Sequence, residues 1–141
     1  MKKLIICLFL FSFSNLYSSE IKFEKIFDNL NKPWSLSFIT KENLIITEKE
    51  GRLLILNLKN KNINEIKHNL SLISLGQGGL LDVLYRDKTI YVSYSENRGN
   101  WETSTTVAKG IFDKEKIIFK NIFRAEPPID SGYHFGSRLV I

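Results

Sequence analysis

Hydrophobic and polar positions alternate along this chain in short runs, as they do in half-buried β-strands. The run Pro33-Trp34-Ser35-Leu36-Ser37-Phe38-Ile39 shows the two-residue period most clearly. A first round of four strands is predicted at residues 33–39, 43–48, 52–58 and, more weakly, 62–67. Asn62 to Leu75 is the only plausible helical stretch, and its asparagines disfavour a helix.

A second round repeats this pattern further along the chain. It is predicted at residues 80–85, 89–95, 104–112 and 117–123, and another strand begins at 138–141. The repeating unit is four antiparallel strands in about 45–55 residues, the length of a propeller blade. We therefore expect an all-β chain that forms an incomplete β-propeller of about two blades plus the first strand of a third. A single β-sandwich is the alternative.

The N-terminus has a different pattern, which is typical of a secretory signal peptide. Lys2 and Lys3 precede an apolar run from Leu4 to Phe13, and small polar residues follow. The run is shorter than the roughly 20 residues of a membrane-spanning helix. We predict that residues 1–19 are a signal peptide, cleaved after Ser14 or Ser19, and that residues 20–141 are periplasmic or secreted. The alternative is that residues 1–19 are not cleaved and anchor the protein in the membrane. If they are cleaved, only this peptide is expected to contact the membrane.

Removal of residues 1–19 changes the chemistry available to the rest. It takes away the only cysteine, two of the 20 basic side chains and none of the 15 acidic ones, which lowers the net charge from +5 to +3. The remaining lysines are scattered among acidic residues, and no stripe of basic and aromatic residues is present. Nucleic-acid binding is therefore not expected. Disulfide chemistry is not expected either.

Two glycine-rich turns, each followed by an apolar strand pattern, are the strongest candidates for a functional site. The first is Gly76-Gln77-Gly78-Gly79-Leu80-Leu81-Asp82-Val83, and the second is Gly132-Tyr133-His134-Phe135-Gly136-Ser137-Arg138-Leu139-Val140. His134 on such a loop could be a general base, since imidazole titrates near neutral pH. It could equally be a structural histidine that caps the local backbone.

The neighbouring polar residues allow both functional and structural readings. Gln77 could donate to and accept from a sugar hydroxyl, or be a loop residue without a role. Arg138 could orient a ligand oxygen, or form a structural salt bridge with Asp82 or Glu126. Asp82 follows two leucines, so it is expected on the polar face or, if buried, with a partner.

Three other residues are expected to have structural roles. Trp34 is predicted to pack between blades, Trp101 to lie at a rim or anchor a loop, and His68 to be a surface residue.

No paired cysteines, HxxxH pattern or EF-hand loop is present, so no metal site is predicted within the chain.

Because these motifs follow one another in the same order, the chain resembles the N-terminal portion of the soluble glucose/sorbosone dehydrogenases, six-bladed propellers that use pyrroloquinoline quinone (PQQ). The resemblance covers nearly all of residues 26–141. It rests on segments 30–34 and 46–53, on 76–83 followed by 90–95, and on 134–139.

The resemblance implies an activity and a set of site residues. His134 matches the family's catalytic base, which removes a sugar hydroxyl proton while hydride leaves to PQQ. Gln77 matches a substrate-pocket residue. Tyr133 replaces an aspartate of the glucose-oxidising member, which makes glucose preference doubtful. Most PQQ contacts and the calcium site are expected downstream of Ile141, so the chain alone is expected to be inactive.

The resulting hypothesis is the N-terminal part of a PQQ-dependent dehydrogenase for a sugar or polyol, with the electron acceptor left open. Two other classes compete with it, because a fold alone does not define a function. One is a non-catalytic propeller that binds a protein or glycan. The other is a hydrolytic propeller such as a lactonase, which would need a calcium-binding cluster of Asp, Asn and Glu that this portion does not contain.

Overall fold

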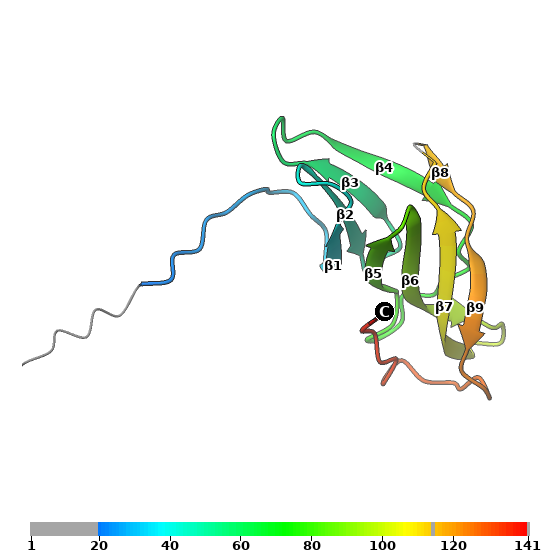
Figure 1. The fold of residues 1–141 in the computed structure, drawn as a ribbon. Coiled ribbons are helices and arrows are strands. Elements are labelled where there is room, and N and C mark those ends of the chain that lie inside the picture. The colour runs from blue at the N-terminus through cyan, green and yellow to red at the C-terminus, as the bar shows by residue number, and fades with distance from the viewer. Residues whose placement is uncertain (1–19, 114, 141) are drawn as a thin grey trace, which may run out of the picture.

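The computed structural model describes residues 20–113 and 115–140, and the predicted signal peptide lies outside them. Its strands form two sheets that lie side by side, with the C-terminal segment running below the second sheet towards β5 (Figure 1). The strands are β1 (Pro33–Phe38), β2 (Asn43–Glu48), β3 (Leu53–Asn57), β4 (Ile63–His68), β5 (Leu80–Arg86), β6 (Thr89–Asn97), β7 (Thr103–Ile111), β8 (Lys116–Ile117) and β9 (Lys120–Arg124). Within the described ranges no helix is long and apolar enough to span a membrane.

The first sheet has the order β1-β2-β3-β4-β8, and the second has the order β5-β6-β7-β9. Consecutive strands within each blade pair antiparallel, which confirms the two predicted rounds of four strands. The helical alternative for residues 62–75 is wrong, because Ile63–His68 forms β4 and pairs with β3. The structure is all-β and contains two blades of an open, incomplete propeller.

One predicted strand is divided in two. Residues 117–123 were expected to be continuous, but Ile117 belongs to β8, which pairs parallel with β4, and β9 begins at Lys120. The side chain of Asn69 explains the break. Its Oδ1 accepts the Phe119 N–H at 2.8 Å, and its Nδ2 donates to the Phe119 carbonyl at 3.1 Å. Both backbone groups of Phe119 are thus satisfied without a strand partner.

The main core lies between the two sheets. Apolar side chains of the first sheet, such as Ile45 and Leu53, pack with Ile90, Val92 and Tyr94 of the second, and all five are at most 1% exposed. A smaller cluster, formed by Leu44, Ile46, Leu54 and Leu56, lies apart from this core.

β1 meets the second sheet through its serines, not through its apolar side chains. The Tyr85 N–H donates to Ser37 Oγ at 3.0 Å, and Ser35 Oγ donates to the Asp82 carboxylate. Trp34 is 43% exposed and does not belong to the core between these two blades, and its indole N–H donates to Ser137 Oγ at 3.0 Å; packing against another blade stays a prediction. The two-residue period was read correctly, but the polar face of this strand is the one that faces its neighbour.

His68 was also assigned wrongly, because it is half-buried and not a surface residue. Its Nε2 lies 2.7 Å from the Gly51 carbonyl, and its Nδ1 accepts the Leu70 N–H at 3.3 Å. A carbonyl can only accept, so Nε2 carries the proton and the imidazole joins β4 to the turn before β3.

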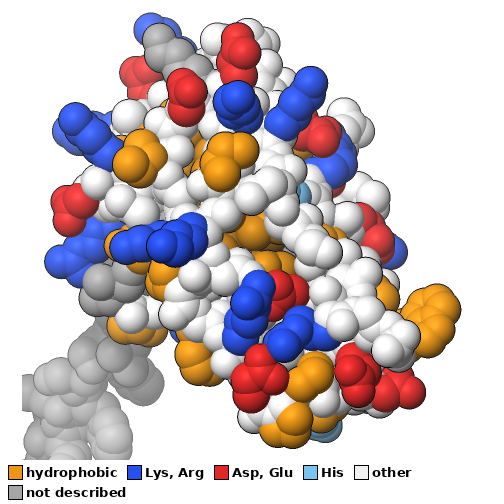
Figure 2. All heavy atoms as spheres, turned by 90° about the vertical axis from the view of Figure 1, so that its right-hand side faces the viewer, with side chains coloured by type: hydrophobic (Ala, Val, Ile, Leu, Met, Phe, Trp, Pro, Cys, Tyr) orange, Lys and Arg blue, Asp and Glu red, His pale blue; other side chains and the backbone are white. Residues whose placement is uncertain are grey.

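The outer side of the second sheet carries charged residues together with exposed apolar ones such as Ile111, Ile122 and Phe123. Figure 2 shows basic and acidic side chains mixed with scattered apolar ones on the side of the molecule where β8 and β9 lie. β9 is the edge strand of this sheet and has the sequence Lys-Asn-Ile-Phe-Arg. Charged residues at a sheet edge disfavour pairing with another chain.

Candidate functional site

The two glycine-rich loops predicted from the sequence lie against each other. The Gln77 N–H donates to the Gly132 carbonyl at 2.7 Å, and the His134 N–H donates to Gln77 Oε1 at 3.1 Å. One loop precedes β5 and the other follows β9, so the second sheet brings together residues 57 positions apart in the chain. The structure therefore places Gln77 and His134, both exposed, at one site.

Glycine is required where the backbones meet. Gly76 has φ +56°, and a Cβ built there would collide with the Gly132 carbonyl oxygen. Gly79 has φ +148°, and its Cβ would collide with the carbonyl of Lys49 in the turn after β2. Any other residue would force these segments apart.

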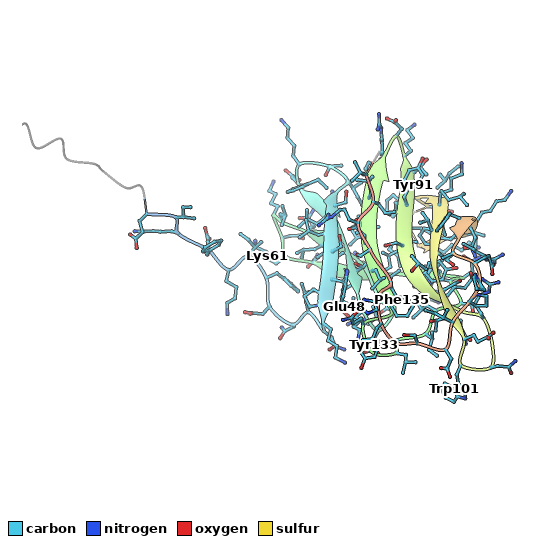
Figure 3. All side chains as sticks on the ribbon, turned by 90° about the horizontal axis from the view of Figure 1, so that it is seen from below. Glu48, Lys61, Tyr91, Trp101, Tyr133 and Phe135 are labelled. Atoms are coloured by element: carbon cyan, nitrogen blue, oxygen red, sulfur yellow. The ribbon has the colours of Figure 1, made fainter. Side chains whose placement is uncertain are left out.

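His134 lies between an exposed and a buried aromatic residue. Tyr133 is 59% exposed, and its ring centroid lies 6.3 Å from that of His134. Phe135 is 5% exposed, so its buried ring fixes the segment against the second sheet. Figure 3 shows Tyr133 and Phe135 on the segment that follows β9. All three residues line a cavity of about 120 Å³, together with residues of β7 and the segment 125–129.

Side chains of the second sheet hold the His134 segment on both sides of the imidazole. Thr103 Oγ1 donates to the Ser131 carbonyl at 3.0 Å, Thr105 Oγ1 to the Phe135 carbonyl at 2.7 Å, and Ser93 Oγ to the Ser137 carbonyl at 2.6 Å. Sequence reasoning missed these anchors. In β6 the serines at 93 and 95 alternate and so share a face, but β7 begins with four consecutive hydroxyl residues, so its sequence does not show which of them face the His134 segment.

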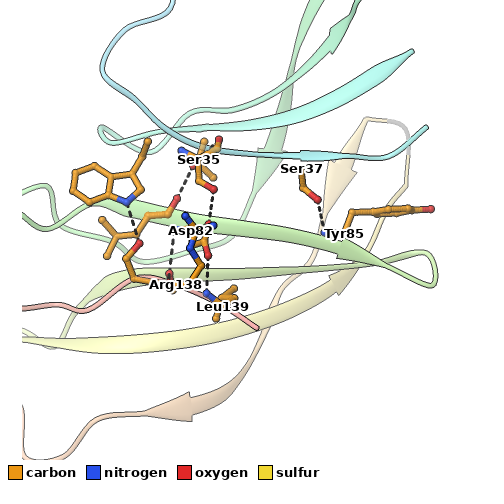
Figure 4. Close-up of polar contacts among 11 residues, drawn as sticks. Ser35, Ser37, Asp82, Tyr85, Arg138 and Leu139 are labelled. Atoms are coloured by element: carbon orange, nitrogen blue, oxygen red, sulfur yellow. Dashed lines mark hydrogen bonds and ion pairs between the residues drawn. The ribbon is translucent and has the colours of Figure 1, made fainter. Parts of the chain in front are cut away.

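Asp82 is a buried carboxylate that is hydrogen-bonded directly to the segment carrying His134 (Figure 4). Its side chain is 4% exposed, and its Oδ2 accepts the Leu139 N–H at 2.6 Å. Its other oxygen accepts from Ser35 of β1 and lies 3.6 Å from Arg138 Nη1. The expectation that a buried Asp82 would need partners is confirmed, and the partners come from two different segments.

Arg138 forms an ion pair with Asp82, one of the two partners expected for a structural role, and its possible role toward a ligand stays a prediction. Its guanidinium pairs with Asp82, while Glu126 pairs with Arg98 at 2.8 Å. The Arg138 side chain remains 80% exposed, so the pair adds little stability and the guanidinium can still meet a ligand. Residues 138–140 were expected to begin a third blade, but they are not assigned to a strand. Leu139 uses its N–H on the Asp82 carboxylate and not on a neighbouring strand.

Lys49 is a second contact that the sequence did not predict. Its Nζ donates to the Gly76 carbonyl at 2.5 Å, and its carbonyl accepts the Leu80 N–H at 3.0 Å. The turn after β2 thereby holds the loop that carries Gln77. In the same turn, a hydrogen bond from Lys32 lowers the pKa of the exposed Glu50 carboxyl.

No group of three or more His, Cys, Asp or Glu side chains suited to a metal ion occurs in residues 20–113 and 115–140. The described site thus consists of an exposed imidazole, an exposed amide, a phenol and a guanidinium on loops held by two propeller blades. These groups can exchange protons and hydrogen bonds with a polar ligand.

This arrangement of blades and loops agrees with comparisons to known proteins. Residues 30–141 match the family described as glucose / sorbosone dehydrogenase. The chain therefore belongs to the glucose/sorbosone dehydrogenase family.

Individual relatives agree in sequence and in fold. The aldose sugar dehydrogenase YliI of Escherichia coli strain K12 is 31% identical over 129 residues, which is 85% of this chain and 35% of the relative. The apo-form crystal structure of the soluble aldose sugar dehydrogenase from Escherichia coli superimposes with a TM-score of 0.77, at 31% identity, over 84% of this chain and 37% of that chain.

A more distant neighbour shares the fold alone. The PQQ-bound aldose sugar dehydrogenase from Streptomyces coelicolor is 18% identical, with a TM-score of 0.65 over 74% of this chain and 33% of that chain. This chain spans about a third of the length of the curated relatives it matches.

Proposed function

We propose that this chain is the N-terminal part of a periplasmic, PQQ-dependent dehydrogenase for an aldose or polyol, with His134 as the base. The observation that carries the proposal is the meeting of the two glycine loops, which puts exposed His134 beside Gln77 on a fixed backbone. Membership of the glucose/sorbosone dehydrogenase family supports the substrate class. The signal-peptide pattern of residues 1–19 supports the location.

In this proposal the residues of this chain bind the sugar and move one proton. The imidazole of His134 accepts the proton of the substrate hydroxyl, and the hydrogen on the same carbon leaves with its electron pair. Gln77 and Tyr133 provide hydrogen bonds that orient the hydroxyl towards the imidazole. PQQ, when bound, supplies the quinone that accepts the hydride.

The described residues fit only part of a PQQ site. PQQ is anionic, and the exposed guanidinium of Arg138 is a suitable group to meet one of its carboxylates. No group of carboxylates for the expected calcium ion is found in the described part of the chain. Since the chain spans about a third of the length of its curated relatives, we propose that the rest of the protein provides the calcium ligands and most cofactor contacts, and we expect residues 1–141 alone to be inactive.

The test is His134→Ala in the protein purified from its own cell and loaded with PQQ and calcium. Loss of a general base is expected to reduce kcat by roughly 10²- to 10⁴-fold. Added imidazole is expected to restore part of the activity, since it replaces the missing group. Glu65→Gln, on the exposed outer part of β4, is the control and is expected to keep full activity. Wild-type turnover by His134→Ala on every sugar tested would refute the base assignment.

A further inference from the structure

The amide of Gln77 has a defined orientation in this structure. Its oxygen faces the backbone N–H of His134 at 3.1 Å. A backbone N–H can only donate, so the atom that faces it must be the amide oxygen and not the amide nitrogen. The orientation therefore follows from the chemistry of the contact itself.

Gln77 joins the two loops at two points. Its backbone N–H donates to the Gly132 carbonyl, and its side chain accepts from His134 two residues further on. The loop that carries Gln77 is itself held. The Gly78 N–H donates to the Leu75 carbonyl and the Gly79 N–H donates to Ser95 Oγ, both at 2.7 Å. Gln77 thus links His134 to a fixed part of the second sheet.

His134 needs such a link, because its backbone lies in the left-handed region at φ 65°. Residues with a side chain adopt this region uncommonly and keep it where surrounding contacts hold them there. The hydrogen bond from the His134 N–H to Gln77 is a contact of this kind. Without it, the backbone of His134 could relax and the imidazole would lose its direction.

We propose that Gln77 is a positioning residue that fixes the backbone of His134 through its amide oxygen. One of the two acceptor positions of its oxygen is used by the His134 N–H, and the amide N–H₂ group takes no part in that bond. Gln77 therefore meets a ligand mainly as a donor, for example to a hydroxyl or ring oxygen of a sugar. The catalytic part of this proposal rests on the function proposed above, whereas the backbone link does not.

Two substitutions separate the oxygen from the nitrogen. Gln77→Glu keeps an acceptor for the His134 N–H and removes the amide donor. Gln77→Met keeps the length of the side chain and removes both. Because Gln77 is exposed and lies in a loop, neither substitution is expected to prevent folding.

The first readout is amide hydrogen exchange at His134 in the whole protein, with no ligand added. Exchange is expected to be roughly fivefold faster in Gln77→Met than in wild type, and unchanged in Gln77→Glu, since one hydrogen bond is lost only in the former. Equal exchange in wild type and Gln77→Met would overturn the link.

The second readout is steady-state kinetics of the PQQ-loaded protein. Gln77→Glu is expected to raise KM for the sugar with little change in kcat, and Gln77→Met is expected to lower kcat as well. If both variants change only KM, Gln77 is a substrate contact and its positioning role in catalysis is refuted. If wild type oxidises no sugar, the proposed function fails, while the exchange experiment still decides the link.

Discussion

Two buried carboxylates, Glu96 and Asp82, solve the same physical problem in different ways. Each is at most 6% exposed, so each must be compensated by hydrogen bonds or a counter-charge. Every partner of the Glu96 side chain lies in the second sheet. The partners of Asp82 come from β1 and from the segment that carries His134. Glu96 links strands within one sheet, whereas Asp82 links the second sheet to β1 and to the loop that carries His134.

The Glu96 network is saturated. Arg124 donates to both carboxylate oxygens, at 2.7 and 2.8 Å, in a bidentate pair. Thr106 donates to one oxygen at 2.8 Å and Asn121 to the other at 2.9 Å. These four bonds leave Glu96 little capacity for a ligand, although it lines a cavity of about 430 Å³. We therefore interpret Glu96 as a structural residue.

The largest expected effect is the loss of stability on replacing Glu96. In Glu96→Gln the amide N–H₂ would face the Arg124 guanidinium, and two donors cannot satisfy each other. Unfolding in urea is expected to show a loss of about 3 kcal/mol. The control is Glu65→Gln, which breaks an exposed pair with Arg52 and is expected to cost less than about 1 kcal/mol. Equal losses in the two variants would contradict the structural role of Glu96.

The same carboxylate predicts how stability depends on pH. Burial raises the pKa of Glu96, but hydrogen bonds from Arg124 and Thr106 and the charges of Arg124 and Arg98 outweigh it, so the pKa is lowered from its ordinary value of 4.5. A lowered folded-state pKa means that ionised Glu96 stabilises the fold above the unfolded-state value, and that this contribution is lost as pH falls through the folded value.

The measurement is the stability difference between wild type and Glu96→Gln at a series of pH values. The difference is expected to be constant near neutral pH and to shrink below about pH 4.5, as wild type loses the ionised form. A difference that stays the same down to acid pH would mean that folding does not lower the pKa of Glu96.

Asp82 should behave differently from Glu96, because its replacement disturbs both stability and the site. In Asp82→Asn the remaining oxygen can still accept from the Leu139 N–H. The new N–H₂ group then faces Ser35 Oγ, which must turn from donor to acceptor, and the Arg138 guanidinium, which can only donate. A loss of about 2 kcal/mol in unfolding free energy is expected. At temperatures where both variants are folded, Asp82→Asn is also expected to lower kcat, whereas Glu96→Gln is not. Equal kcat values in the two variants would remove the distinction between them.

The sequence predicted most of the fold because its signals are local. Alternation and turn residues located eight of the nine strands, and the glycine spacing identified both loops of the site. What it missed depends on contacts between distant residues. The break before β9 results from Asn69, 50 residues away, and nothing near Phe119 indicates it.

Side-chain partners were missed for the same reason. Gln77 was interpreted as a substrate residue, and its bond to the His134 backbone exists only because two loops meet in the folded chain. Likewise, alternation in β1 shows that there are two faces, but the choice of the serine face for β5 depends on where Asp82 and the Tyr85 N–H lie. Periodicity gives the faces of a strand without saying what each face contacts.

The smallest expected effect comes from adding one methyl group where the two loops meet. Gly76→Ala places a Cβ against the Gly132 carbonyl at φ +56°. The matched control is Gly99→Ala, at φ +83° with no atom within 4 Å of the new Cβ, so both variants carry backbone strain but only one carries a collision. Gly76→Ala is expected to be less stable than the control by about 1 kcal/mol, because only its Cβ collides with backbone. It is also expected to speed amide exchange at His134, since pushing the loops apart weakens the Gln77 link. If the two alanine variants are equal in stability and in exchange at His134, the close approach of the loops does not hold the imidazole, and its position depends on Asp82 and on the hydroxyl contacts from β6 and β7.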